Sequence, residues 1–215
     1  MYVEKYGLDG IQTLFRGTLR GEGFCAGWDA LVQLGCVRDD VSMTWPSGCS
    51  WADWLRSFVP AQWAEEGLES AVRRVTQCSE ETVNRLNWLG LFDDQSGPQI
   101  TKGTPAQIIQ SLLEVKWELK PQDRDMIVMW HRFDYEINGI RKARTSSLSL
   151  EGKDSVFTAM SDTVGLPMAL AVKPVMAGTF GTTGVDVPMS KTYYEPLLKG
   201  LADLGIRFVE TELTR

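Results

Sequence analysis

Histidine and paired cysteines are scarce in this sequence. Among 215 residues there is one histidine, His131, which excludes most schemes in which a histidine base activates a serine or cysteine nucleophile. Cys25, Cys36, Cys49 and Cys78 form no C-x-x-C pair and lie far from His131 along the chain, so a zinc site is not expected. Reduced structural thiols, as in cytoplasmic proteins, are the expectation.

Long hydrophobic runs and clusters of positive charge are also missing. No apolar stretch approaches the roughly 20 residues of a membrane helix, and the first residues, M-Y-V-E-K-Y-G, do not form a signal peptide. The formal net charge is −6, without a run of Lys and Arg, which argues against a nucleic-acid surface. These absences predict a soluble, cytoplasmic protein with no membrane or nucleic-acid partner.

The stretch from Thr13 to Phe24 carries two arginines four residues apart. At the two-residue period of a strand, Arg16, Thr18 and Arg20 share one face, with the arginines roughly 13 Å apart. Such a pair suits a ligand with more than one carboxylate, because guanidinium binds carboxylate as a bidentate fork. The alternative is a solvated sheet edge, since exposed arginine is common.

From about residue 22 to 120 the sequence has helical spacing and helix-capping residues. Gly35 is expected to end the helix that starts at Phe24, and Ser50 is a predicted N-cap. Thr104 followed by Pro105 is typical of another helix start. The predicted helices cover residues 24–34, 51–58, 68–75, 80–91 and 105–119.

Tryptophan is concentrated in the same segment. Six of the eight tryptophans fall between Trp28 and Trp88. We interpret them as the core of a small helical subdomain, with a ligand cage as the alternative.

The second half of the sequence predicts a hairpin. The alternation from Ile127 to Ile137 is typical of a half-buried strand. Asn138-Gly139 is a strong turn signal because both turn positions adopt positive φ, and Ile140–Leu150 is the return strand. His131 falls in the apolar phase, which predicts a buried, hydrogen-bonded side chain rather than a catalytic one.

Beyond the hairpin, helical spacing runs from about residue 156 to 176, followed by a glycine-rich loop at 178–186 that is not G-x-G-x-x-G. Thr192 and Glu195 fit a capping box for a further helix, and residues 206–211 read as a final strand. A strand at residues 13–20 cannot be stable alone and is expected to join the later sheet. The prediction is an α+β protein: a mixed sheet domain interrupted by an all-helical insertion, with no Rossmann domain in this chain.

Four ordered motifs spread over most of the chain. They are R-G-T-L-R (16–20) with G-F (23–24), W-L-G-L-F (88–92), R-D-M-I-V-M-x-H-x-F (124–133), and T-A-M-x-x-T-V-G-L-P (158–167) with A-x-K (171–173). Together they resemble the C-terminal part of the saccharopine dehydrogenase family (NADP-dependent, L-glutamate-forming).

The resemblance implies that the chain contains two domains with different roles. Residues 1–21 and 121–215 would form an α/β substrate-binding and dimerisation domain, and residues 22–120 a helical insertion domain. Arg16, Gly17 and Thr18 would contact saccharopine, with Arg20 nearby. NADP would bind an N-terminal Rossmann domain that is missing here, and the whole enzyme would be a homodimer.

The chain departs from the family pattern at three points. Gly21 stands where relatives often carry an aromatic residue, and Pro174 falls inside a predicted helix. No strand is followed by G-x-G-x-x-G, so we expect no cofactor site here. The resemblance implies that the catalytic groups also belong to the missing N-terminal part, so we expect no catalytic residue here and no turnover by this chain alone. No metal site is expected, given the cysteine and histidine spacing. The start at Met1, directly before a predicted core strand, favours a fragment of a longer protein.

The implied function is the substrate-binding part of an oxidoreductase of lysine metabolism. The whole enzyme would interconvert saccharopine with aminoadipate semialdehyde and glutamate, using NADP. One alternative is a dehydrogenase for another carboxylated secondary amine, such as a carboxyspermidine-type substrate, which Arg16 and Arg20 disfavour. Another is a non-catalytic binding or dimerisation module of the same fold.

Overall fold

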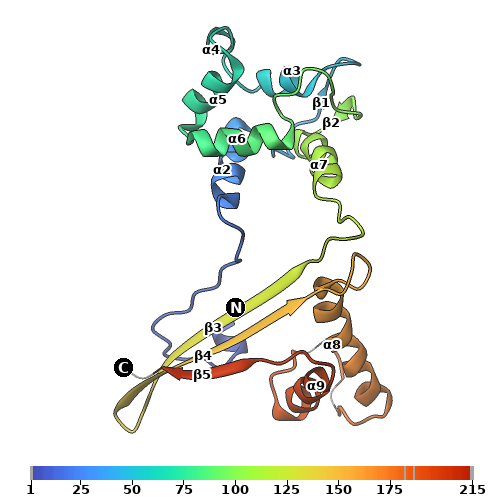
Figure 1. Ribbon diagram of the computed structural model, residues 1–215. Coiled ribbons are helices and arrows are strands. Elements are labelled where there is room, and N and C mark those ends of the chain that lie inside the picture. Colours follow the sequence, from blue (N-terminus) through green and yellow to red (C-terminus); the bar gives the residue numbers. More distant parts are fainter. Residues whose placement is uncertain (1, 182, 186, 214–215) are drawn as a thin grey trace. The chain divides into compact units, whose positions relative to one another are not determined.

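The computed structural model describes residues 2–181, 183–185 and 187–213, and the chain divides into two compact units. The sheet unit runs up to Gly17 and resumes at Leu119, and the helical unit is Thr18–Glu118 (Figure 1). The domain boundaries predicted from sequence, at 21/22 and 120/121, lie a few residues away from these. Each unit is described by itself below.

The helical unit contains short helices and one small ribbon of two strands. The helices are α2 (Phe24–Leu34), α3 (Trp51–Arg56), α4 (Ala61–Ala64), α5 (Leu68–Thr76), α6 (Glu80–Leu89) and α7 (Pro105–Lys116). The ribbon pairs β1 (Met43–Thr44) with β2 (Lys102–Gly103) in antiparallel fashion. Five of these helices lie where they were predicted, whereas α4 and the ribbon were not predicted.

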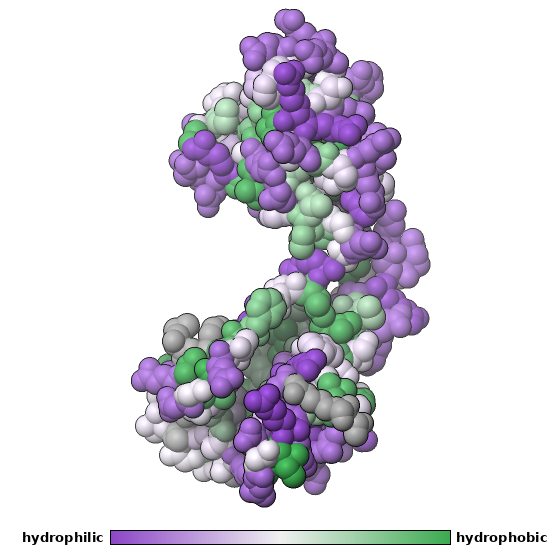
Figure 2. Space-filling model, turned by 90° about the vertical axis from the view of Figure 1, so that its left-hand side faces the viewer, coloured by the Kyte–Doolittle hydropathy of each residue, from purple (hydrophilic) through white to green (hydrophobic). Residues whose placement is uncertain are grey.

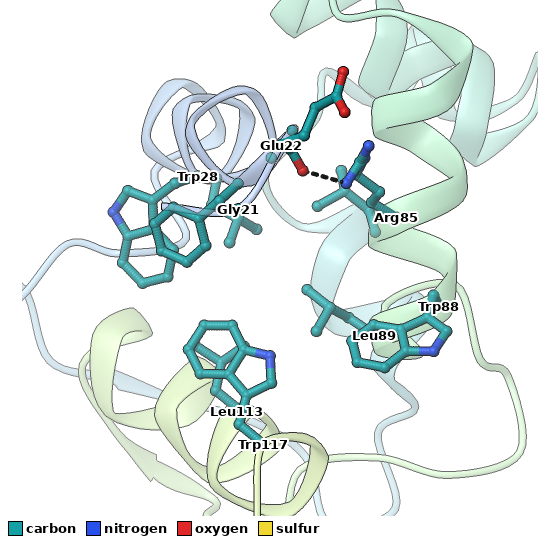
Figure 3. A pocket seen from close by; sticks show the side chains of 13 residues that line it. Gly21, Glu22, Trp28, Arg85, Trp88, Leu89, Leu113 and Trp117 are labelled. Carbon is teal, nitrogen blue, oxygen red and sulfur yellow. Dashed lines mark hydrogen bonds between the residues drawn. The ribbon is translucent and has the colours of Figure 1, made fainter. Parts of the chain in front are cut away.

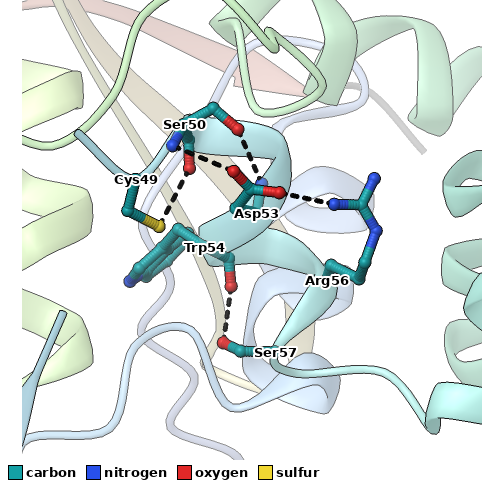
Figure 4. Close-up of polar contacts among 6 residues, drawn as sticks. All are labelled: Cys49, Ser50, Asp53, Trp54, Arg56 and Ser57. Carbon is teal, nitrogen blue, oxygen red and sulfur yellow. Dashed lines mark hydrogen bonds and ion pairs between the residues drawn. The ribbon is translucent and has the colours of Figure 1, made fainter. Parts of the chain in front are cut away.

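Side-chain caps define where α3 and α7 begin. At α3, the Ser50 hydroxyl accepts a hydrogen bond from the Asp53 backbone N–H at 3.0 Å, and the Asp53 carboxylate accepts one from the Ser50 N–H at 3.3 Å (Figure 4). Thr104 and Gln107 form the same reciprocal box at α7, with Pro105 at its first position. Both predicted N-caps are therefore confirmed. Each cap accepts a hydrogen bond from a backbone N–H group that has no partner within the first helical turn.

The core of the helical unit is built around Trp54, which is fully buried. Its ring meets Trp51 edge-on, with the two centroids 5.8 Å apart, and Trp45 in the same way at 6.1 Å. Leucine and isoleucine side chains of α2, α3, α6 and α7 fill the space around these rings: Leu31, Leu34, Leu55, Leu86, Leu89, Ile108, Ile109, Leu112 and Leu113. The core-filling interpretation is confirmed for these three tryptophans.

The sheet unit contains an antiparallel sheet of three strands in the described part of the chain. Its order is β3 (Met126–Ile137), β4 (Ile140–Glu151) and β5 (Val209–Leu213). Asn138 and Gly139 have φ values of 53° and 75°, as the predicted hairpin turn requires. The hairpin is confirmed, while the final strand begins three residues later than predicted.

The described part of this unit also contains three helices: α1 (Tyr2–Lys5), α8 (Ala159–Met176) and α9 (Lys191–Asp203). A small core joins Leu148 of β4 to Leu201 and Ile206. Asp125 fixes the start of α8, because its carboxylate accepts hydrogen bonds from the backbone N–H groups of Ala159 and Met160, at 2.6 and 2.8 Å.

The predicted capping box at Thr192 and Glu195 is wrong. The helix α9 already begins at Lys191, and the extended backbone of an N-cap lies at Ser190, with φ −82° and ψ 153°. Thr192 is therefore inside the first turn. The predicted glycine-rich loop includes residues 182 and 186, which lie outside the described residues.

The strand predicted at residues 13–20 does not form. This segment has no regular secondary structure, and no described strand pairs with it, so the sheet is antiparallel rather than mixed. Phe15 and Leu19 are 87% and 66% exposed, so the predicted apolar face packs on nothing that would hold it in a sheet. Gly17, inside the predicted strand, also weakens strand formation.

The strand β3 is more exposed than its alternation predicts. Its residues are exposed or half-buried on both faces, because the small core of this unit is centred on Leu148 of β4. His131 is exposed, with its ring stacked on Phe133 at a centroid distance of 6.2 Å, so the prediction of a buried histidine is wrong. On the face drawn in Figure 2, apolar residues lie at the surface among hydrophilic ones.

Among the described residues, no helix combines the length and the apolar composition that a membrane span needs.

Candidate functional site

The four residues predicted to contact substrate fall in two units. Arg16 and Gly17 belong to the sheet unit, and Thr18 and Arg20 to the helical unit. All four are exposed and lie in irregular backbone. The prediction that Arg16 and Arg20 share one face of a strand is therefore wrong, because this segment forms no strand. Their contact with a substrate stays a prediction.

Arg20 is oriented by its neighbours within the helical unit. One of its Nη1 protons is donated to the carbonyl oxygen of Leu19 at 2.9 Å. Its guanidinium lies over the ring of Phe24, 5.5 Å from the ring centroid, a cation–π contact. Phe24 in turn lines a pocket that sequence reasoning missed.

This pocket lies within the helical unit and has a volume of about 280 Å³. Its walls come from the segment before α2 and from α2, α6 and α7. Figure 3 shows Trp28 and Trp117 on one side of the open space, Trp88 and Leu89 on the other, and Arg85 with Glu22 at one end. The remaining lining residues are Gly21, Gly23, Phe24, Gly27, Leu31, Leu86 and Leu113.

The aromatic walls are partly open to solvent. Trp28, Trp117 and Trp88 are 36%, 48% and 63% exposed, although tryptophan is highly buried on average. Phe24 stacks on Trp28, with ring centroids 5.9 Å apart and planes 6° apart. The core-filling prediction is wrong for Trp88. One signal was present in the sequence: Trp88 falls outside the apolar stripe of its helix.

The polar end of the pocket is formed by Arg85. Its Nη1 donates to the backbone carbonyl of Glu22 at 2.7 Å, and its Nη2 donates to the carboxylate of Glu81. Gly23, with φ +76°, accommodates this guanidinium, because a Cβ there would lie 2.1 Å from Arg85 Cζ. Nearby, the Lys116 ammonium lies 5.9 Å from the ring centroid of Trp88.

Titratable groups elsewhere are shifted by ordinary surface pairing or burial. In the sheet unit, Arg144 binds Glu210 and Glu212 of β5 at 3.0 and 2.8 Å, and the hydrogen bond from Arg144 lowers the pKa of Glu212. Burial raises the pKa of the Cys36 thiol, which keeps it protonated and unreactive. Within the described ranges, no three His, Cys, Asp or Glu side chains form a group that could hold a metal ion.

Comparison with known proteins gives consistent matches along almost the whole chain. The family model described as the saccharopine dehydrogenase C-terminal domain matches residues 1–206. Saccharopine dehydrogenase [NADP(+), L-glutamate-forming] from Saccharomyces cerevisiae is 31% identical over 211 residues, covering 94% of this chain and 47% of that protein. The mitochondrial alpha-aminoadipic semialdehyde synthase of Bos taurus is 32% identical over 213 residues, covering 96% of this chain and 23% of that protein.

A solved structure also matches. It is the apo histidine-tagged saccharopine dehydrogenase (L-Glu forming) from S. cerevisiae, with a TM-score of 0.83 and 28% identity, covering 99% of this chain and 49% of that one. The chain spans about half the length of the saccharopine dehydrogenases it matches. With the family model matching nearly its full length, the chain belongs to the saccharopine dehydrogenase family and corresponds to its C-terminal domain.

Proposed function

We propose that this chain is the substrate-binding part of a saccharopine dehydrogenase-like oxidoreductase of lysine metabolism. One observation carries the proposal: the yeast saccharopine dehydrogenase fold superposes on 99% of the chain, with a TM-score of 0.83 and 28% identity. In the whole enzyme, hydride would pass between NADP and the lysine-derived carbon bonded to the secondary amine nitrogen that joins the two halves of saccharopine, and water would hydrolyse the resulting imine. The products would be aminoadipate semialdehyde and glutamate.

The role of this chain is to hold the substrate carboxylates. Saccharopine carries three carboxylates, and guanidinium groups bind them bidentately. Arg16 and Arg20 lie in exposed, irregular backbone, where a ligand can reach them. The bond to Leu19 and the stacking on Phe24 orient the guanidinium of Arg20 and leave further N–H donors for a carboxylate. Orienting the substrate in this way would be a positioning contribution to catalysis.

The cofactor and partners belong to the same proposal. The matched relatives named for NADP(+) are about twice as long as this chain, which leaves room for a nucleotide-binding domain. That domain would be an N-terminal Rossmann domain, and the whole enzyme would be a cytoplasmic homodimer. Apolar side chains on both faces of β3 are available for such contacts.

The proposal is tested in the natural-length protein that carries this chain. We expect Arg16→Ala to raise the KM for saccharopine by about tenfold or more, because a charge-assisted hydrogen bond to a carboxylate is lost. The circular dichroism spectrum should not change, since Arg16 is exposed. Arg16→Lys should give an intermediate KM, because lysine keeps the charge without the bidentate geometry.

Arg56→Ala is the matched control. Arg56 is another exposed arginine of this chain, paired with Asp53, and its removal should leave the KM unchanged. Saccharopine kinetics in the Arg16→Ala enzyme that equal those of the wild type would refute the role of Arg16. Turnover of a carboxyspermidine-type substrate but not of saccharopine would refute the substrate.

A further inference from the structure

The pocket in the helical unit has the composition of a ligand site. Ligand pockets are concave, mostly apolar, and carry a few placed polar groups. Here the walls are aromatic and aliphatic, with Arg85 at one end, and the volume of about 280 Å³ is close to the range typical of small-molecule sites. Three half-exposed indole rings line one concavity, so a ligand that entered would remove apolar surface from water.

The arrangement of the walls favours a flat, apolar group. Trp28 and Trp117 border the open space on one side, and Leu89 and Trp88 border it on the other (Figure 3). Aromatic rings interact best in offset-stacked or edge-on arrangements. Indole rings on two sides of the open space can offer both arrangements to a ring that lies between them. A planar ring therefore matches this space better than a branched polar molecule does.

The charges around the pocket favour an anion. The guanidinium of Arg85 closes one end. Its ion pair with Glu81 offsets part of its charge, and this pair and the hydrogen bond to the Glu22 carbonyl use two of its five N–H donors. The Arg20 guanidinium over Phe24 and the Lys116 ammonium near Trp88 add positive charge at the aromatic walls. The Glu22 carboxylate extends away from the open space (Figure 3). The N-terminus of α2, which no side chain caps, adds a partial positive charge at Gly23.

The same charges oppose a cationic ligand. The ring of Phe24 already faces the guanidinium of Arg20, and that of Trp88 faces the ammonium of Lys116. A further cation would therefore be repelled at two of the aromatic rings. A ligand with three carboxylates does not fit either, because most of the wall is apolar and offers no partners for several charges.

We propose that this pocket binds a small aromatic acid, with its ring between the indoles of Trp28, Trp117 and Trp88 and its carboxylate at Arg85. The contact with Arg85 would be a charge-assisted hydrogen bond of the kind arginine makes with carboxylates. One ring with a short acid chain suits the size of the space.

The probe is phenylpropionate, titrated into the 215-residue chain and followed by tryptophan fluorescence and calorimetry. We expect a dissociation constant of about 1 mM or tighter, as befits a ligand of this size. Phenylpropanol and phenylpropylamine share the ring and the chain but are neutral and cationic. The acid should bind about tenfold more tightly than the alcohol, and the amine should bind most weakly.

Gly27→Leu tests the location of the site. Gly27 lies on α2 and lines the pocket, and a Cβ added there meets nothing within 4 Å, so the side chain of leucine would start in open space at the pocket wall. Binding of phenylpropionate should be lost while the helical content is kept, since leucine favours helix over glycine. Gly165→Leu is the matched control, because Gly165 lies on α8 with the same open surroundings and outside the pocket.

Arg85→Gln tests the charge. It should weaken binding of the acid about tenfold, to the level of the alcohol, and leave the alcohol unaffected. If Arg85→Gln does not fold, the Gly27→Leu comparison still decides the location. The proposal is overturned if phenylpropionate fails to bind at about 10 mM, if its binding survives Gly27→Leu, or if the alcohol or amine binds as tightly as the acid.

Discussion

At the scale of single residues, one glycine of the helical unit lies so close to another backbone segment that no side chain fits there. A Cβ placed on Gly97 would lie 1.8 Å from the carbonyl oxygen of Cys49. The neighbouring Ser96 carbonyl accepts a hydrogen bond from the Trp51 N–H at 2.8 Å, so the two backbone segments are held against each other. Because both sides of the contact are backbone, neither can move without breaking this pairing.

Gly97→Ala is therefore expected to lower the free energy of unfolding by about 1–3 kcal/mol, as overpacking does in well-packed interiors. Urea denaturation followed by circular dichroism measures the change. Gly27→Ala is the control, because its Cβ meets nothing within 4 Å and alanine on a helix should stabilise by about 0.5–1 kcal/mol. Equal denaturation midpoints for the two variants would contradict the contact argument.

The tryptophans show how far the burial of a single residue can be predicted from sequence. Trp51 and Trp54 could be assigned to the core from sequence, because they fall among apolar residues at helical spacing, whereas Trp45 lies in a connection beside Pro46 and was assigned only as one of the six clustered tryptophans. The position of Trp88 outside the apolar stripe indicated that it is not a core residue, but its place in a pocket could not be predicted, since the other walls come from α2 and α7 and only the packing of these helices brings them together. The arginine pair was identified, but its geometry was inferred from a strand that does not form.

At the scale of elements, local signals fix helix starts and turns. The polar contacts around Ser50 and Asp53 satisfy the open donors at the start of α3 (Figure 4). Hydrogen bonding with Ser50 lowers the pKa of Asp53, with a smaller contribution from Arg56. A carboxyl group whose pKa is lower in the folded state binds more protons when unfolded, so it contributes stability above its unfolded pKa.

This contribution is expected to fade as the pH falls from about 4 through the lowered pKa of Asp53, because protonation removes the acceptor at the helix start. Asp53→Asn should be less stable than the wild type at pH 6, and the difference should shrink towards pH 3. Urea midpoints across this pH range measure it. A difference that stays constant with pH would show that Asp53 does not act through its charge.

The fold could be predicted from sequence at most places where the signal was local, the capping box at Thr192 and Glu195 being the exception. The caps at Ser50 and Thr104 and the turn at Asn138-Gly139 each depend on a few neighbouring residues, and each was confirmed. The segment Thr13–Phe24 shows the limit, because alternation describes two faces of a strand but supplies no partner for its backbone. The exposure of β3 could not be foreseen either, since burial depends on which elements pack over it.

At the scale of the whole molecule, the two units have cores of very different size. The core of the helical unit extends over α2, α3, α5, α6 and α7, whereas that of the sheet unit gathers around Leu148, Leu201 and Ile206. Buried apolar area is the main source of stability. The sheet unit therefore has less buried apolar area to oppose local opening.

Hydrogen exchange should show this inequality. Backbone amides of β3 and β4 are expected to exchange about tenfold faster or more than those of α2, α6 and α7, because local opening costs less where few apolar contacts are lost. Mass spectrometry of peptic fragments gives the rates for each segment. Equal protection in the two units would show that the hairpin is stabilised by something other than its own core.

The hairpin has a further consequence for how this chain behaves in solution. In the described sheet, β3 lies at one edge, so a row of backbone N–H and C=O groups twelve residues long has no neighbouring strand. Met126, Val128 and Trp130 line one side of it. Such an edge is a template for fibril-like self-association. Charged side chains on an edge oppose this, but Arg132 and Asp134 form an ion pair at 2.9 Å, so their charges largely cancel and the protection is weak. Concentration and time, as much as temperature, will therefore decide how long the isolated chain stays dispersed.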